Sequence, residues 1–337
     1  MRRLMFALFA AILLIGGLCA WLLTAYKPVP VDPAWAVAGE QTVSEGEVTV
    51  RFTGTSTLLF SDGETHWMVD GWFSRPGPLQ LAVGRIMPDL DAIERGLAAN
   101  EVGELAAVIP VHSHYDHAMD APEVARRTGA LLLGSEATAN IGRGWGLPED
   151  RIGVLADRTP VAVGDFVITP IESRHFQFAD AAMRERALGN PDIEAPLVPP
   201  VSAFDYRLGK AYVLHVEHPK GSFAVIGSAG YVEGGLEGYQ ADVVFLGVGG
   251  LGSQTANYRQ DYWRETVGRL QPDTVVPIHY DSLTGPIEGE FRGPVMLMGF
   301  LSSGLEKTLP FLKARAEEAP GLRFMTLPRY DEVVLFN

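Results

Sequence analysis

The chain of 337 residues has a single cysteine and a shortage of basic residues. Cys19 alone cannot form an intramolecular disulfide, so the fold is expected to rely on packing. Lysine and arginine number 27 against 41 acidic residues, and the resulting net charge of −14 disfavours nucleic acid as a partner. The content of 47% hydrophobic and 20% charged residues is typical of a globular chain and excludes general disorder.

The longest uncharged apolar run lies near the amino terminus. Two arginines precede the run from Leu4 to Ala25, which is about as long as a bilayer-spanning helix. The pattern predicts a single-pass transmembrane helix over residues 1–25, anchored in the inner (cytoplasmic) membrane. The positive-inside rule then places the rest of the chain on the periplasmic, extracytoplasmic side. The proline-rich residues 26–47 are predicted to form an extended linker.

Residues 48–337 alternate short β-rich runs with helical ones, which is typical of an α/β domain. Strands are expected at residues 48–53, 56–61, 66–69, 105–111, 131–133, 166–171, 211–216, 223–226, 243–246 and 274–277. Helices are expected at residues 88–99, 122–128, 258–270 and 305–318. The proline-rich stretch from Phe176 to Ser202 breaks this alternation, and we interpret it as a lid over a functional site.

A dense group of metal-binding residue types follows the apolar run Leu105–Val111. It reads His112-Ser113-His114-Tyr115-Asp116-His117 and holds three of the eight histidines in the chain. Neutral imidazole and carboxylate groups are the ligands that zinc prefers in such sites. The weaker alternative is a solvated polar turn with chance histidines. The position of the group after a buried strand favours the metal site.

This motif resembles the His-x-His-x-Asp-His motif of the metallo-β-lactamase superfamily. The resemblance covers most of the chain after the linker and implies a four-layer αββα sandwich over residues 48–337. It extends to His175 and His279, each of which follows a predicted strand. It also includes Asp70 in the sequence Met68-Val69-Asp70-Gly71, where the family has an aspartate that supports the metal shell.

The resemblance implies the roles of these residues. It predicts metal ligation by six side chains: His112, His114, His175, Asp116, His117 and His279. The expected metal is zinc, as one or two ions, with iron and manganese as alternatives. Asp116 is expected to be catalytic, because it would orient a metal-bound hydroxide. Asp70 is expected to fix the tautomer of a ligand imidazole through a hydrogen bond.

One position departs from the family pattern. Most members have a Gly-Asp pair after a strand, and its carboxylate bridges two metals. This chain has Gly227-Ser228 instead, although a serine near this place is similar to one subclass of true metallo-β-lactamases. Glu233 is a candidate replacement for the missing carboxylate. We expect Ser228 and Tyr280 to lie at the rim of the site, within reach of substrate.

The flanking sequences Gly54–Leu59 and Ile278–Asp281 are most similar to the branch that contains ascorbate-phosphate lactonases and N-acylphosphatidylethanolamine phospholipase D enzymes. This similarity implies a hydrolase that cleaves an ester, lactone or phosphodiester of a small-molecule or lipid substrate. The expected membrane anchor favours a lipid-like substrate. Two alternatives stay open, namely a periplasmic β-lactam hydrolase and a non-catalytic metal-binding member of the fold. The sequence leaves the oligomeric state open.

Two further patterns have a structural explanation that we prefer. Residues 247–252 match G-x-G-x-x-G, which is typical of dinucleotide sites, but five residues separate them from the next predicted helix. We therefore expect a loop at the rim of the metal site. His215 and His218 are three positions apart on a predicted strand, so their side chains point to opposite faces and should not bind one metal together.

Overall fold

The computed structural model describes residues 2–37, 41–297 and 304–337. One set of strands comprises β1 (Val48–Gly54), β2 (Thr57–Ser61), β3 (His66–Val69), β4 (Ala107–Ile109), β5 (Leu131–Gly134), β6 (Ile152–Val154) and β14 (Val333–Phe336). A second set comprises β7 (Val161–Val163), β8 (Phe166–Ser173), β9 (Ala211–His218), β10 (Gly221–Ile226), β11 (Val243–Gly247), β12 (Thr274–Ile278) and β13 (Arg323–Phe324).

The helices are α1 (Arg2–Thr24), α2 (Pro78–Val83), α3 (Leu90–Ala99), α4 (Tyr115–Ala118), α5 (Ala121–Thr128), α6 (Glu136–Trp145), α7 (Ala181–Leu188), α8 (Ala256–Glu265), α9 (Val267–Leu270) and α11 (Thr308–Glu318). In the described residues, the helix expected at 258–270 is broken. The backbone of Thr266 leaves the helical region, with φ −113° and ψ −87°, and separates α8 from α9.

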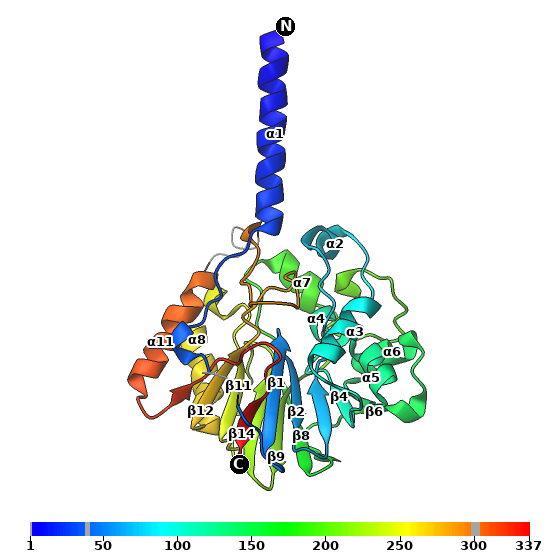
Figure 1. Cartoon of the computed structure of the whole chain (residues 1–337), viewed down its shortest axis with the longest axis vertical. Coiled ribbons are helices and arrows are strands. Elements are labelled where there is room, and N and C mark those ends of the chain that lie inside the picture. Colours follow the sequence, from blue (N-terminus) through cyan, green and yellow to red (C-terminus); the bar gives the residue numbers. More distant parts are fainter. Residues whose placement is uncertain (1, 38–40, 298–303) are drawn as a thin grey trace.

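Two seven-stranded sheets form a sandwich (Figure 1). The strand orders are β14-β1-β2-β3-β4-β5-β6 and β13-β12-β11-β10-β9-β8-β7. Helices α5 and α6 pack on β4 and β5 of the first sheet, while α8 and α11 lie beside β11 and β12 of the second (Figure 1). This arrangement confirms the predicted α/β class and the two-sheet sandwich.

The apolar run at the amino terminus forms helix α1, which projects away from the body (Figure 1). Within the part of the chain that the structure describes, no helix has the length and apolarity needed to cross a membrane. The predicted transmembrane helix is therefore not confirmed. Part of the predicted linker contacts the body, since Val31 is buried and the Trp35 ring lies 4.7 Å from that of Phe324.

Aromatic side chains join the two sheets in the core. Phe60 on β2 stacks on Trp67 of the same sheet at 4.9 Å and on Phe223 of the other sheet at 4.4 Å, measured between ring centroids. It also meets Phe245 edge-on at 5.3 Å. All four side chains are fully buried. The central strands are buried on both faces, and this is why they are continuous apolar runs in the sequence.

Strand direction places the candidate site. Strands β3 and β4 run parallel, as do β10, β11 and β12, and β8 is parallel to β10 because both are antiparallel to β9. The segments that hold Asp70, the motif of residues 112–117, His175 and His279 all come just after the carboxyl ends of such strands. The topology therefore gathers them at one edge of the sandwich.

Replacement of Phe60 by alanine tests the core. Because the cavity would open between the two sheets, we expect the Phe60→Ala variant to lose about 3–5 kcal/mol in free energy of unfolding, measured by urea denaturation. Val154→Ala is a matched control on β6, where the side chain is 52% exposed, and should change the free energy by less than about 0.5 kcal/mol. Equal losses in the two variants would contradict the described core.

Candidate metal centre

Six of the predicted residues lie together in two adjacent groups. His112, His114 and His175 form one group, and Asp116, His117 and His279 form the other. In each group the three ligand-type atoms lie within 4.8 Å of one another, as metal ligation requires. The ring centroids of His112 and His117 are 3.8 Å apart, so the two groups adjoin. The predicted convergence of residues separated by more than 160 positions is therefore observed.

The hydrogen bonds of the first group leave at least one ring nitrogen of each histidine for a cation. His175 donates from Nδ1 to the carbonyl of Phe176 at 2.8 Å, which leaves Nε2. His114 donates from Nε2 to the carbonyl of Ala187 on α7 at 3.2 Å, which leaves Nδ1. Both ring nitrogens of His112 are buried without a hydrogen-bond partner among the described residues. A buried orphan of this kind is costly unless it has a ligand, so the group fits a metal ion.

In the second group Asp70 orients an imidazole. Its Oδ2 accepts a hydrogen bond from Nδ1 of His117 at 2.8 Å, while its Oδ1 accepts one from the backbone of Val111 at 2.9 Å. Nε2 of His117 therefore faces Asp116, whose Oδ2 lies 3.5 Å away. The same carboxylate oxygen is 3.3 Å from Nε2 of His279. The hydrogen bond from His117 to Asp70 is the kind of contact predicted for Asp70.

Burial and neighbouring charges set the protonation states. Burial, followed by repulsion from the other imidazoles, holds the pKa of His112 and of His175 well below the ordinary value. Burial also lowers the pKa of His114. Burial would raise the pKa of Asp116, but His117 and His279 outweigh it and bring that pKa far below its usual range. Burial would lower the pKa of His117, but the charges of Asp70 and Asp116 outweigh it and raise that pKa. The neutral imidazoles of the first group and the ionised Asp116 are the forms that bind metals.

The glycine-rich segment at 247–252 lies against the centre. A β-carbon on Gly249 would come within 2.6 Å of Nδ1 of His279, so only glycine permits this approach. His279 itself has a left-handed backbone with φ +58°, and its amide donates to the carbonyl of Thr55. Only a short 3-10 segment, Leu251–Ser253, follows the glycines before α8. The segment is therefore a loop beside the site, without the helix that a dinucleotide would need.

Three other predicted positions lie outside both groups. Ser228 follows β10, and its buried Oγ has no hydrogen-bond partner among the described residues. Glu233 is exposed and belongs to neither group, so it does not replace the missing carboxylate. Tyr280 is only 4% exposed and packs against Phe52 and Phe291, with ring centroids 5.9 and 5.5 Å apart. Its predicted place at the rim is wrong because the chain turns its ring into the core.

A third group escaped the sequence analysis. His218 lies with Asp62 and Asp165, and its Nε2 is 3.5 Å from Asp62 Oδ2. Because Nδ1 of His218 accepts a hydrogen bond from the Lys220 amide at 3.3 Å, its Nε2 carries the proton and points at Asp62. A protonated nitrogen does not bind a metal, so this group is better described as a histidine–carboxylate pair. His218 is the last residue of β9, Asp62 follows β2, and Asp165 lies in the turn between β7 and β8. They are far apart in the sequence and form no motif.

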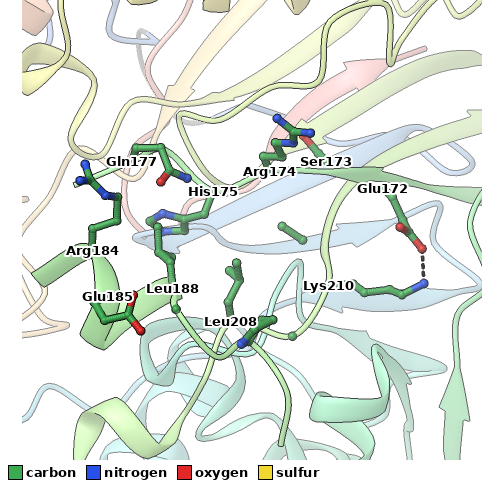
Figure 2. A pocket seen from close by; sticks show the side chains of 14 residues that line it. Glu172, Ser173, Arg174, His175, Gln177, Arg184, Glu185, Leu188, Leu208 and Lys210 are labelled. Carbon is green, nitrogen blue, oxygen red and sulfur yellow. Dashed lines mark hydrogen bonds and ion pairs between the residues drawn. The ribbon is translucent and has the colours of Figure 1, made fainter. Parts of the chain in front are cut away.

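A cavity of about 510 Å³ opens beside His175 (Figure 2). Its walls come from the segment just after β8, from α7, and from residues 208–211 at the start of β9. The rings of Phe176 and Phe178 flank His175 at 4.3 and 5.7 Å. The stretch from Phe176 to Ser202, interpreted above as a lid, thus forms a wall of this cavity and contains α7.

Known proteins are similar to this chain in sequence and in fold. No model of a protein family matches the chain. A curated UPF0173 metal-dependent hydrolase of Anaeromyxobacter sp. (strain K) is 28% identical over 158 residues. The matched region is 44% of this chain, and the chain spans only half the length of that relative.

Solved structures show the same fold. Igni18, a metallo hydrolase from the hyperthermophilic archaeon Ignicoccus hospitalis KIN4/I, has a TM-score of 0.51 and 17% identity over 86% of this chain and 99% of its own. A possible metal-dependent hydrolase from Veillonella parvula DSM 2008 has a TM-score of 0.50 and 12% identity over 87% of this chain and 100% of its own.

At these identities the structural likeness shows the fold alone, a two-sheet α/β sandwich consistent with the metallo-β-lactamase fold. The curated relative and both solved structures are named metal-dependent or metallo hydrolases. Their names agree with the enzyme class expected from the motifs.

Replacement of Asp70 by asparagine tests the orientation of His117. The amide removes the charge that fixes the His117 tautomer, so we expect affinity for Zn²⁺ to fall by about 10–100-fold. The measurement is a competition titration with a chromophoric chelator. Asp150→Asn is a control on the exposed surface and should leave the affinity unchanged. Unchanged affinity in Asp70→Asn would contradict the orienting role.

Proposed function

We propose that the chain is a metal-dependent hydrolase. The proposal rests on one observation, namely two adjoining groups of metal-binding side chains, with five imidazoles and one carboxylate between them. His112, His114 and His175 would hold one ion, and Asp116, His117 and His279 a second. We propose zinc, with iron and manganese as alternatives because the same ligand types accept them.

A metal bound here would lower the pKa of water and polarise the scissile bond. The side chains of the protein do the rest. Asp116 has its Oδ2 between His117 and His279, so it can orient the attacking water and accept a proton. Asp70 keeps Nε2 of His117 directed into the site. The Phe176 and Phe178 rings beside His175 exclude solvent from one side of the centre.

The bond we propose is an ester, lactone or phosphodiester. The support for it is the resemblance of Gly54–Leu59 and Ile278–Asp281 to the lactonase and phospholipase D branch. Ser228 stands where a bridging aspartate is usual, and among the described residues no carboxylate belongs to both groups. A single ion in the three-histidine group would still provide an open position for water, and the hydrolase proposal does not require two ions.

A double substitution tests the function. We expect His112→Ala with His114→Ala to abolish both zinc retention and hydrolysis, because two of three ligands of one group are lost. Metal content is measured by elemental analysis, and hydrolysis with panels of chromogenic esters, lactones and phosphodiesters. His66→Ala is the matched control, since His66 is an exposed histidine at the start of β3.

The outcomes separate the alternatives. Full hydrolysis in the double variant would overturn the proposal. Stoichiometric metal in the unaltered protein with no hydrolysis of any panel would instead favour the non-catalytic alternative. Turnover of penicillin or a carbapenem, without turnover of the other substrates, would favour the β-lactam hydrolase.

A further inference from the structure

The cavity beside His175 has an uneven charge. Three basic side chains, Arg174, Arg184 and Lys210, line it together with two acidic ones, Glu172 and Glu185. Lys210 is paired with Glu172, as Figure 2 shows. Neither arginine forms an ion pair with a residue that the structure describes. Apart from the Lys210–Glu172 pair, the cavity is therefore lined by two guanidinium groups and one carboxylate, that of Glu185.

The two arginines are placed differently from Glu185. Arg184 donates from Nη1 to the carbonyl of Phe178 at 3.0 Å, which holds its side chain toward the segment that follows His175. Its remaining N–H groups can donate hydrogen bonds to a ligand. Figure 2 shows Arg184 and Glu185 leaving α7 in opposite directions, with Arg174 across the cavity from both. The carboxylate therefore does not neutralise either arginine directly.

The cavity also adjoins the candidate metal centre. His175 forms part of its wall, and the carbonyl of Ala187 on α7 accepts the hydrogen bond from His114. A volume of about 510 Å³ is in the ordinary range for small-molecule sites. Leu188, Pro191 and Leu208 supply an apolar surface. A ligand here would thus have one end near the metal centre and its body against apolar side chains.

The negative charge of the whole chain makes the positive charge of this cavity unusual. With a net charge of −14, the protein as a whole repels anions, so a local excess of positive charge in one cavity is not a general property of its surface. Guanidinium groups bind carboxylate and phosphate groups through paired hydrogen bonds. The local charge is therefore complementary to an acidic ligand.

We propose that this cavity binds a small organic anion through Arg174 and Arg184, so that the substrate carries a carboxylate or phosphate group apart from the bond that is cleaved. This inference rests on the proposed hydrolase function and adds its substrate class. The two arginines are specificity-determining residues, and the apolar wall accepts the uncharged part of the molecule.

Binding of inert probes tests the proposal without turnover. The probes are 3-phenylpropanoate, phenylphosphonate and the neutral 3-phenylpropanamide, titrated calorimetrically into the full-length, zinc-loaded protein. We expect at least one anion to bind about tenfold more tightly than the amide. Arg174→Gln and Arg184→Gln should each weaken binding of that anion by about tenfold, the usual effect of losing one charge-assisted hydrogen bond, and leave amide binding unchanged.

Arg186→Gln provides a matched control on the same helix. Arg186 stacks on the ring of Phe204 at 3.7 Å and does not line the cavity, so this variant should keep the anion preference. All variants are compared at equal zinc content, so direct binding of anions to zinc is the same in each.

Three results would overturn the inference: equal affinity for anions and amide, no measurable binding of any probe, or an anion preference that survives both cavity substitutions. The last result would mean that the anion contacts only the metal ion and not the two arginines. Hydrolysis that depends on His112 and His114, combined with any of these results, would leave the proposed function intact. An arginine-dependent anion preference without hydrolysis of any panel would instead count against the proposed function alone.

Discussion

The structure depends on the burial of imidazole groups where the carboxyl ends of strands from two sheets meet. This burial is costly, because each ring loses water and neighbouring imidazoles repel one another when they are charged. His112 shows this most clearly, since neither of its nitrogens has a protein partner in the described residues. Such a cluster persists only with a rigid scaffold, and the sandwich provides one through its aromatic core.

The scaffold could be predicted from the sequence where strands are buried on both faces. Central strands such as β2, β11 and β12 are continuous apolar runs, and their expected positions agree with the structure within one or two residues. The short strands β6, β7, β13 and β14 have two to four residues each, which is too short for a pattern to identify them as strands. The break at Thr266 was equally hidden within a helical pattern.

For the site, residues close together in the sequence were the easiest to identify. The motif at 112–117 is visible by itself, whereas His175 and His279 required the spacing of a known family. Tyr280 shows the limit of this reasoning, because adjacency to His279 says nothing about the direction of its ring. Two basic residues of the cavity, Arg184 and Lys210, were hidden for a similar reason. They come from different segments, and only the folded chain brings them to one cavity.

The hydrogen bond between His114 and the carbonyl of Ala187 joins the candidate metal centre to α7. One partner follows β4, and the other lies on the helix within the long connection between β8 and β9. The contact fixes which nitrogen of His114 carries the proton. Any displacement of α7 therefore changes the free energy with which His114 binds a cation. Thermodynamic reciprocity then requires that cation occupancy stabilise the docked position of α7 by the same amount.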